Sequence, residues 1–374
     1  MTRMTATASL PIASVRPPRL ASLDAFRGFT IVGMLWVNNL SSSMPVPRQF
    51  GHARWGDFPT FCDMIFPWFL LIVGVALPFA KASRLKRGIS RPRYYLGAFR
   101  RMAMLMMLGW LINSSGAKRI VIGLDVLQLI GLAYLTAALC DDFPRRVRMA
   151  IIAALFLWHW TLLRFIPIPG MGAGVFDQDR NAITYINSIL QPYHLRGFFS
   201  TFPTAALVMI GAFVGDMLRN PDMAPTRKSL RVAALGAVMI VIGLVWHLDL
   251  PMNKTVWTPP YLLFAGGIGC VILALFHQII DVAGFRRWAF PLVVFGMNAI
   301  TVYVLSILVR LHVFFEWETT LSDGTDVNLW TASLRWFESS LGAPTGGMVM
   351  IAAYISAWWL VMYWLYRRNI FWRV

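Results

Sequence analysis

The side chains best suited to chemistry gather near the start of the chain, between two apolar stretches. The first stretch, TIVGMLWVNNL, ends in Asn38 and Asn39, the segment GHARW then brings His52 and Trp55, and the second stretch opens as FCDMIFPWF with Asp63. Two consecutive apolar stretches favour a helical hairpin. The hairpin places all five of these residues at the same end.

His52 is the leading candidate for a general base. A histidine has an ordinary pKa close to neutral pH, so it can take a proton during a reaction, and a carboxylate such as Asp63 could orient it or stabilise its protonated form. Asp63 has a second interpretation, as a carboxylate in the first turn of a helix that caps its own backbone. The other histidines fit structural or interfacial positions better, with His194 as a weaker ligand candidate.

Further polar residues are predicted at the same level, at the ends of other helices. Several helices that present amides, a cation and aromatic rings at one level indicate a pocket for a polar, sugar-like ligand. The predicted substrate-binding residues are Trp55, Asn39, Lys254, Trp257 and Gln128.

The composition excludes a soluble globular protein. Hydrophobic residues make up 57% of the 374 and charged residues 14%, against about 45–50% and about 25% in ordinary soluble domains, and the mean hydropathy is +0.60. The three cysteines, Cys62, Cys140 and Cys270, lie in apolar stretches and form neither a disulfide framework nor a metal-ligand pattern. We interpret them as core residues and expect no metal.

The apolar stretches predict membrane-spanning helices, because a span needs about 20 mostly apolar residues whose backbone groups are bonded internally. The ten predicted spans run at about Phe26 to Leu40, Phe61 to Ala80, Met102 to Asn113, Leu124 to Leu139, Met149 to Ile166, Phe199 to Leu218, Val232 to Leu248, Tyr261 to Val282, Ala289 to Leu311 and Gly346 to Trp364. Leu329 to Leu341 is predicted as a surface or re-entrant helix. The predicted fold is all-α, a polytopic bundle of about ten transmembrane helices, with residues 1–20 as a cytoplasmic arm and 21–374 as one domain.

The net charge of +17 raises the question of nucleic acid binding. The cations, however, collect in alternate connectors, and residues 81–101 alone hold eight of them and no acid. Lys and Arg concentrate in short cytoplasmic loops. Both termini are therefore predicted to be cytoplasmic, and we expect membrane lipid around the protein and no nucleic acid partner.

Ordered sequence blocks cover the chain from Arg19 to about Val309. They are RLASLDAFRG, WVNN, GHARW, DMIFPWFLLIVG, LDVLQLIGLAYL, GFFSTFPTAALVMIGAFVGD, NKTVWTP and FPLVVFGMNAITVYV. In this order they resemble the heparan-α-glucosaminide N-acetyltransferase family of transmembrane acyltransferases. The short N-terminus is similar to the bacterial NagX-like branch, which implies the bacterial inner membrane as the location.

The resemblance implies acetyl transfer from cytosolic acetyl-CoA to the amine of a glucosamine-type sugar on the opposite side of the membrane. Within the matching blocks, the family's active-site histidine falls on His52, its nearby asparagine on Asn38 and its acidic position on Asp63. The loop departs from the family pattern, because Gly56 follows Trp55 directly and one extra residue precedes Thr60.

The phosphates of CoA need cations, and arginine suits phosphate through its planar donor fork. Arg100 and Arg101, at the start of the third predicted span, are the predicted CoA-binding residues. Direct transfer in a ternary complex is favoured over an acetyl-histidine route, because it needs only a base and a fixed geometry and because no Ser or Cys nucleophile is expected beside His52.

Two other function classes fit the sequence in part. Ten helices with polar groups also suit an inner-membrane transporter of an amino sugar or N-acetylglucosamine, although no internal repeat is visible. A non-catalytic scaffold would not require His52. The family resemblance also implies that a homodimer is possible.

Overall fold

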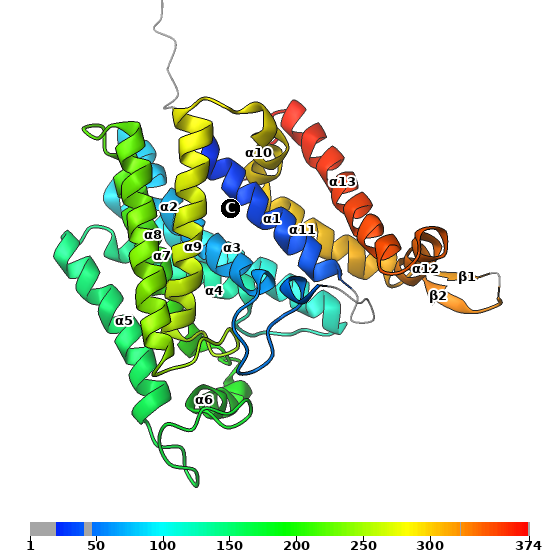
Figure 1. Cartoon of the computed structure of the whole chain (residues 1–374), viewed down its shortest axis with the longest axis horizontal. Coiled ribbons are helices and arrows are strands. Elements are labelled where there is room, and N and C mark those ends of the chain that lie inside the picture. Colours follow the sequence, from blue (N-terminus) through cyan, green and yellow to red (C-terminus); the bar gives the residue numbers. More distant parts are fainter. Residues whose placement is uncertain (1–19, 41–46, 322, 373–374) are drawn as a thin grey trace, which may run out of the picture.

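A computed structural model describes residues 20–40, 47–321 and 323–372, so most of the predicted arm, residues 1–19, lies outside the described residues. The described chain is a bundle of thirteen α-helices with one small sheet (Figure 1). The helices are α1 Ala21–Asn39, α2 Phe61–Lys86, α3 Arg91–Ala117, α4 Val126–Cys140, α5 Arg145–Phe165, α6 Ala182–Leu190, α7 Thr201–Arg219, α8 Pro225–His247, α9 Pro259–Phe276, α10 Phe290–Met297, α11 Ala299–Val309, α12 Leu329–Leu341 and α13 Thr345–Arg367. Strands β1 (Glu318–Thr320) and β2 (Asp326–Asn328) pair antiparallel. The all-α prediction is confirmed.

All ten predicted spans are helical, and α12 matches the predicted additional helix. In the described part of the chain, seven helices are long and apolar enough to cross a membrane, and α10 with α11, bent by 68° at their junction, would make eight. The two remaining segments are not among them: α1 has 19 residues, including Asp24 and Arg27, and α4 has only 15 residues. The protein is a multi-pass membrane protein.

Helices α2 and α7 form the centre of the bundle. Each has 78% of its apolar window buried, whereas α3 and α5 have only 22%, which places α3 and α5 on the lipid-facing outside. A Cβ atom at Gly74 of α2 would lie 2.0 Å from the backbone oxygen of Val208 in α7. Glycine is therefore required there, because only its missing side chain lets the two backbones approach so closely.

The bend between α10 and α11 lies at Asn298, where the backbone leaves the helical conformation with φ −125°. The Asn298 side chain donates to the backbone oxygen of Ile370 at 3.1 Å and accepts from the backbone N–H of Trp372 at 3.1 Å. This side chain thus ties the broken helix to the segment after α13.

Two hydrogen bonds fix the start of α9 beside the start of α2. The Trp68 indole N–H donates to the backbone oxygen of Ala265 at 2.9 Å, and the Tyr261 hydroxyl donates to the backbone oxygen of Asp63 at 2.5 Å. The connector between α8 and α9 is thereby brought next to the connector between α1 and α2. These two connectors carry most of the site.

Candidate active site

Asp63 is the buried anchor of the site, with a side chain only 1% exposed. Its Oδ2 accepts the backbone N–H groups of Ala53 at 3.0 Å and Thr60 at 3.1 Å. The Thr60 hydroxyl lies 3.0 Å from the same oxygen and 2.7 Å from the backbone oxygen of Gly51. Thr60 and Asp63 form a capping box at the start of α2, in which the side chains satisfy backbone donors left free by the first helical turn.

His52 contacts the other oxygen of the Asp63 carboxylate. Its Nδ1 lies 2.8 Å from Asp63 Oδ1, and its side chain is 60% exposed. In the tautomer that carries its proton on Nδ1, His52 donates this proton to Asp63, because a carboxylate oxygen and a bare ring nitrogen would repel at this distance. Asp63 thus caps α2, as one interpretation expected, and it also lies within hydrogen-bond distance of His52, so its orienting role stays a prediction. In that tautomer Nε2 keeps its lone pair, which is the arrangement a general base requires.

Lys254 brings a positive charge to this pair from the connector between α8 and α9. Its Nζ lies 2.9 Å from His52 Nδ1, 3.3 Å from Nε2 and 3.4 Å from Asp63 Oδ1. The connector is shaped by Asn253, whose side-chain oxygen accepts the backbone N–H of Thr255 at 2.8 Å. A buried carboxylate is costly unless it is paired, and Lys254 supplies the balancing charge.

Cys62 is the residue at this site that sequence reasoning missed. Its Sγ lies 3.0 Å from His52 Nδ1 and 3.8 Å from Nε2, so the expectation that no Cys lies beside His52 is wrong. Its position directly before Asp63 was the available signal, but ten residues separate it from His52 in the sequence. We name His52, Cys62, Asp63 and Lys254 the His52 cluster. The first three offer ligand atoms that all lie within 4.8 Å of one another and could hold a metal ion.

Two predicted tryptophans border the cluster's connectors. The Trp55 indole N–H donates to the backbone oxygen of Phe176 at 3.2 Å, and the two rings lie 5.1 Å apart. The turn after Trp55 uses Gly56, whose φ of +86° favours glycine. Trp257 packs its ring 5.1 Å from the ring of Phe66. Aromatic surfaces therefore lie on both connectors, although substrate binding by either tryptophan stays a prediction.

Asn38 and Asn39 meet Arg310 instead of His52. The Arg310 guanidinium donates to Asn39 Oδ1 at 3.0 Å and to the backbone oxygen of Asn38, whose side chain is exposed. Among the described residues, no hydrogen bond joins either asparagine to the His52 cluster. Their catalytic and substrate-binding roles stay predictions. Arg310 was not among the predicted site residues, although a cation inside an apolar stretch could have indicated it.

Gln128 lies fully buried at the start of α4. Its Oε1 accepts the backbone N–H of Asp125 at 3.3 Å, which closes a second capping box. This contact gives Gln128 a structural role, and its predicted contact with substrate remains untested.

The two predicted CoA-binding arginines differ in their surroundings. Arg100 is exposed, whereas Arg101 places its guanidinium 4.3 Å from the centre of the Tyr134 ring, and its Nε is buried without a hydrogen-bond partner. Arg84, near the end of α2, lies over the Tyr94 ring at 6.0 Å and close to Gly97 of α3. Arg84 thus contacts α3, the helix that carries Arg101, a contact that was not predicted.

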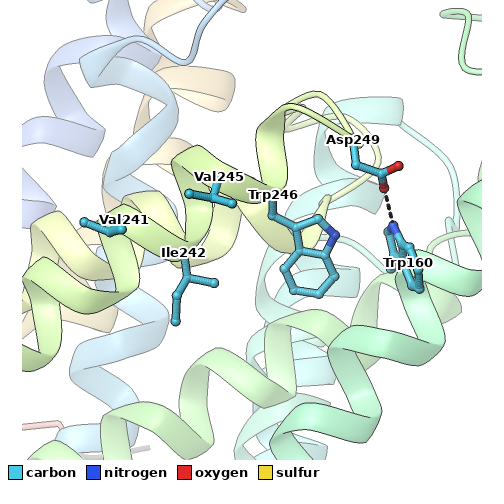
Figure 2. A pocket seen from close by; sticks show the side chains of 6 residues that line it. All are labelled: Trp160, Val241, Ile242, Val245, Trp246 and Asp249. Atoms are coloured by element: carbon cyan, nitrogen blue, oxygen red, sulfur yellow. Dashed lines mark hydrogen bonds between the residues drawn. The ribbon is translucent and has the colours of Figure 1, made fainter.

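A cavity of about 490 Å³ lies apart from the cluster. Its lining comes from the exposed faces of α5 and α8 and the start of the next connector, and Figure 2 shows its Trp160 donating to Asp249 at 2.6 Å. The lining residues are Trp160, Val241, Ile242, Val245, Trp246 and Asp249. An almost wholly apolar hollow on lipid-facing helices is suited to hydrocarbon rather than to a sugar.

A family model described as heparan-alpha-glucosaminide N-acetyltransferase, catalytic, matches residues 19–248, which is more than half of the chain. The chain belongs to this family. The matched range includes His52, Cys62 and Asp63, whereas Lys254 lies beyond it.

Two relatives extend the similarity to nearly the whole chain. The human protein named heparan-alpha-glucosaminide N-acetyltransferase is 24% identical over 430 aligned residues, and the mouse protein of the same name is 22% identical over 424. These alignments cover 96% and 95% of this chain but 61% and 60% of the relatives. The chain therefore spans about three fifths of the length of the curated relatives it matches.

Proposed function

We propose that this protein is a transmembrane acetyltransferase that moves an acetyl group from cytosolic acetyl-CoA to the amine of a glucosamine-type sugar on the opposite side of the membrane. The observation that carries this proposal is the His52 cluster, in which an exposed imidazole is oriented by the buried carboxylate of Asp63. Membership of an acyltransferase family favours this function over the transporter. The bacterial inner membrane and the NagX-like branch are supported by the sequence resemblance alone.

In the proposed reaction, His52 Nε2 removes a proton from the sugar ammonium or from the amine as it attacks. The amine nitrogen forms a bond to the thioester carbon, the bond between carbon and CoA sulfur breaks, and the CoA thiolate takes a proton to leave as free CoA. Asp63 stabilises the imidazolium that forms in between. Lys254, whose Nζ lies 3.3 Å from Nε2, is proposed to stabilise the developing oxyanion. Asn38 is predicted either to donate its amide to the thioester oxygen or to hold the imidazole tautomer.

Direct transfer of the acetyl group in a ternary complex remains the proposed route. The nearness of Cys62 means that the absence of a cysteine beside His52 no longer supports it. The Cys62 side chain is only 5% exposed, and it contacts Nδ1, the ring nitrogen already bonded to Asp63. A nucleophile must be reached by the thioester and deprotonated by a free base atom. The exposed Nε2 is better placed to serve an incoming amine than to activate this buried thiol.

The donor is proposed to approach along α2. Asp63 and Arg84 are 21 residues apart in this helix, which corresponds to about 32 Å at ~1.5 Å per residue, close to the ~30 Å thickness of the hydrocarbon core. Arg84 and Arg101 would hold CoA phosphates at one end, with Arg100 at the exposed rim. The acetyl group would then reach His52 at the other end.

The test uses purified protein in proteoliposomes with labelled acetyl-CoA and glucosamine. We expect labelled N-acetylglucosamine from the unmodified chain and a loss of at least roughly 10²-fold in His52→Ala, because a general base contributes about 10²- to 10⁴-fold. His312→Ala is the matched control, since His312 is half exposed and pairs with Glu316. Equal turnover by His52→Ala would remove the assignment. Accumulation of N-acetylglucosamine without consumption of acetyl-CoA would establish the transporter instead.

A further inference from the structure

His52, Cys62 and Asp63 place a nitrogen, a sulfur and an oxygen donor around one point. Asp63 Oδ1 lies 2.8 Å and Cys62 Sγ lies 3.0 Å from the same atom, His52 Nδ1. Asp63 Oδ2 is occupied by two backbone N–H groups, so Oδ1 is the oxygen available to a ligand. We infer that this set is an inhibitory binding site for a thiophilic divalent cation of the Zn²⁺ or Cd²⁺ type.

The donor set fits the preferences of zinc. Zinc takes thiolate, imidazole and carboxylate ligands at about 2.0–2.3 Å in tetrahedral geometry, which places neighbouring ligand atoms about 3.5 Å apart. The observed spacings would have to widen by only about half an ångström. Three protein donors leave a fourth position for water. The exposed side chain of His52 gives the ion a path from solvent.

Lys254 holds its ammonium beside two of the three donor atoms, where it would compete with the ion. Its Nζ lies 2.9 Å from Nδ1 and 3.4 Å from Asp63 Oδ1, and its side chain is 33% exposed, so it can move into solvent. A divalent ion with one thiolate and one carboxylate has no net charge. The ion therefore balances Asp63 without Lys254, and the two cations compete for one place.

Binding would switch off the proposed base. A metal at Nδ1 requires that nitrogen to be deprotonated, so the imidazole proton moves to Nε2 and the Cys62 thiol proton is released to solvent. Nε2 then has no lone pair to accept a proton from an amine. This inhibition rests on the proposed function, whereas the binding itself does not.

The test measures metal binding by the full-length chain in detergent, with no reference to activity. Cd²⁺ should produce the ultraviolet charge-transfer absorption of a thiolate complex, and Zn²⁺ should compete with a chelator. We expect Cys62→Ser and Cys62→Ala to abolish the absorption and to weaken Zn²⁺ binding by at least roughly tenfold, since even outer-shell changes cost about 10- to 100-fold. Cys270→Ser, in a fully buried cysteine of α9, should behave as the unmodified protein. Lys254→Met should bind Zn²⁺ more tightly.

The outcomes separate this inference from the proposed function. Unchanged Zn²⁺ affinity in both folded Cys62 variants, or absence of the Cd²⁺ absorption in the unmodified protein, would overturn the site. If binding is found, acetyl transfer by the unmodified protein should fall with added Zn²⁺ and not with Mg²⁺, and each Cys62 variant should need at least roughly tenfold more Zn²⁺ for the same fractional loss. Binding without inhibition would refute the inhibitory role. Binding by a chain that shows no transferase activity would refute the proposed function and leave the metal site standing.

Discussion

Helix α2 has ionisable groups near both ends, and their surroundings differ. At its start, the buried carboxylate of Asp63 is met by two backbone N–H groups, by His52 and by Lys254. Near its end, the guanidinium of Arg101 from α3 lies on the Tyr134 ring, and its Nε has no partner. The negative charge of Asp63 is therefore balanced by groups of the protein, whereas the positive charge of Arg101 is not.

The acidic residues near the end of α2 do not neutralise this positive charge. Asp141 and Asp142 both pair with Lys81 at 2.7 Å, and among the described residues no carboxylate forms an ion pair with Arg84 or Arg101. A balanced, hydrogen-bonded carboxylate is suited to holding a proton on an imidazole. Partly buried cations without acidic partners are suited to an anionic ligand, since an uncompensated charge away from water is costly. The contrast thus predicts chemistry at one end and phosphate binding at the other.

The largest effect is expected from removing the balanced charge. Asp63→Asn should lower acetyl transfer by roughly 10²- to 10⁴-fold, because an amide can neither hold the Nδ1 proton in place with the same strength nor stabilise the imidazolium. It should also lower stability, because Lys254 loses its ion-pair partner. The measurement is turnover together with thermal unfolding in detergent. Asp57→Asn, in an exposed ion pair with Arg48 of the same connector, is the control, and near-normal turnover in Asp63→Asn would contradict the comparison.

Near the other end of α2, a substitution is expected to weaken acetyl-CoA binding without lowering thermal stability. Arg101→Met should raise the KM for acetyl-CoA by about 10-fold or more, since hydrogen bonds to charged groups contribute about 1.5–3 kcal/mol. Thermal stability should be unchanged or higher, because the substitution removes a buried cation that has no acidic partner. Arg100→Gln, at an exposed position, should change the KM less. A destabilised Arg101→Met with normal KM would show that this end is structural.

Local sequence signals were sufficient to predict the helices and part of the His52 cluster. Apolar length predicted every long helix, and the spacing of His52 and Asp63 around a hairpin turn predicted their meeting. The bend at Asn298 was not predicted, because it depends on hydrogen bonds to Ile370 and Trp372, more than 70 residues away in the sequence. Periodicity alone cannot register such a contact.

The rest of the site depends on how helices pack. Lys254 was predicted at the right level of the membrane, but its contact with His52 spans 202 residues and is set by the packing of α9 against α2. Cys62 is buried, as expected for a small cysteine in an apolar stretch, but its contact with His52 was not predicted. Its Sγ lies 3.0 Å from Nδ1, in the first turn of α2, which begins at the capping box.

A smaller effect is expected from removing the Thr60 hydroxyl, which tests whether the capping box positions Asp63 at the start of α2. Thr60→Ala should lower stability by about 1 kcal/mol, the usual cost of losing a helix cap, and should reduce turnover much less than Asp63→Asn. Thr60→Ser keeps the hydroxyl that lies 3.0 Å from Asp63 Oδ2 and should restore most of the stability. Thermal unfolding of the three proteins provides the measurement. If Thr60→Ala were as inactive as Asp63→Asn, the hydroxyl would belong to the chemistry.

The smallest effect concerns the exposed rim near the end of α2, where charge is paired. Hydrogen bonds from Lys81 and Tyr95 lower the pKa of Asp142 below its ordinary value of 3.8. A carboxyl whose pKa is lower in the folded state stabilises the protein above the ordinary pKa and loses this contribution as the pH falls through the folded-state value. Asp142→Asn should therefore lower thermal stability at pH 6, by no more than about 1 kcal/mol for a rim pair, and the difference should shrink toward pH 3. Asp222→Asn, at an exposed position, is the control. A difference that is constant with pH would mean that Asp142 acts through packing rather than through charge.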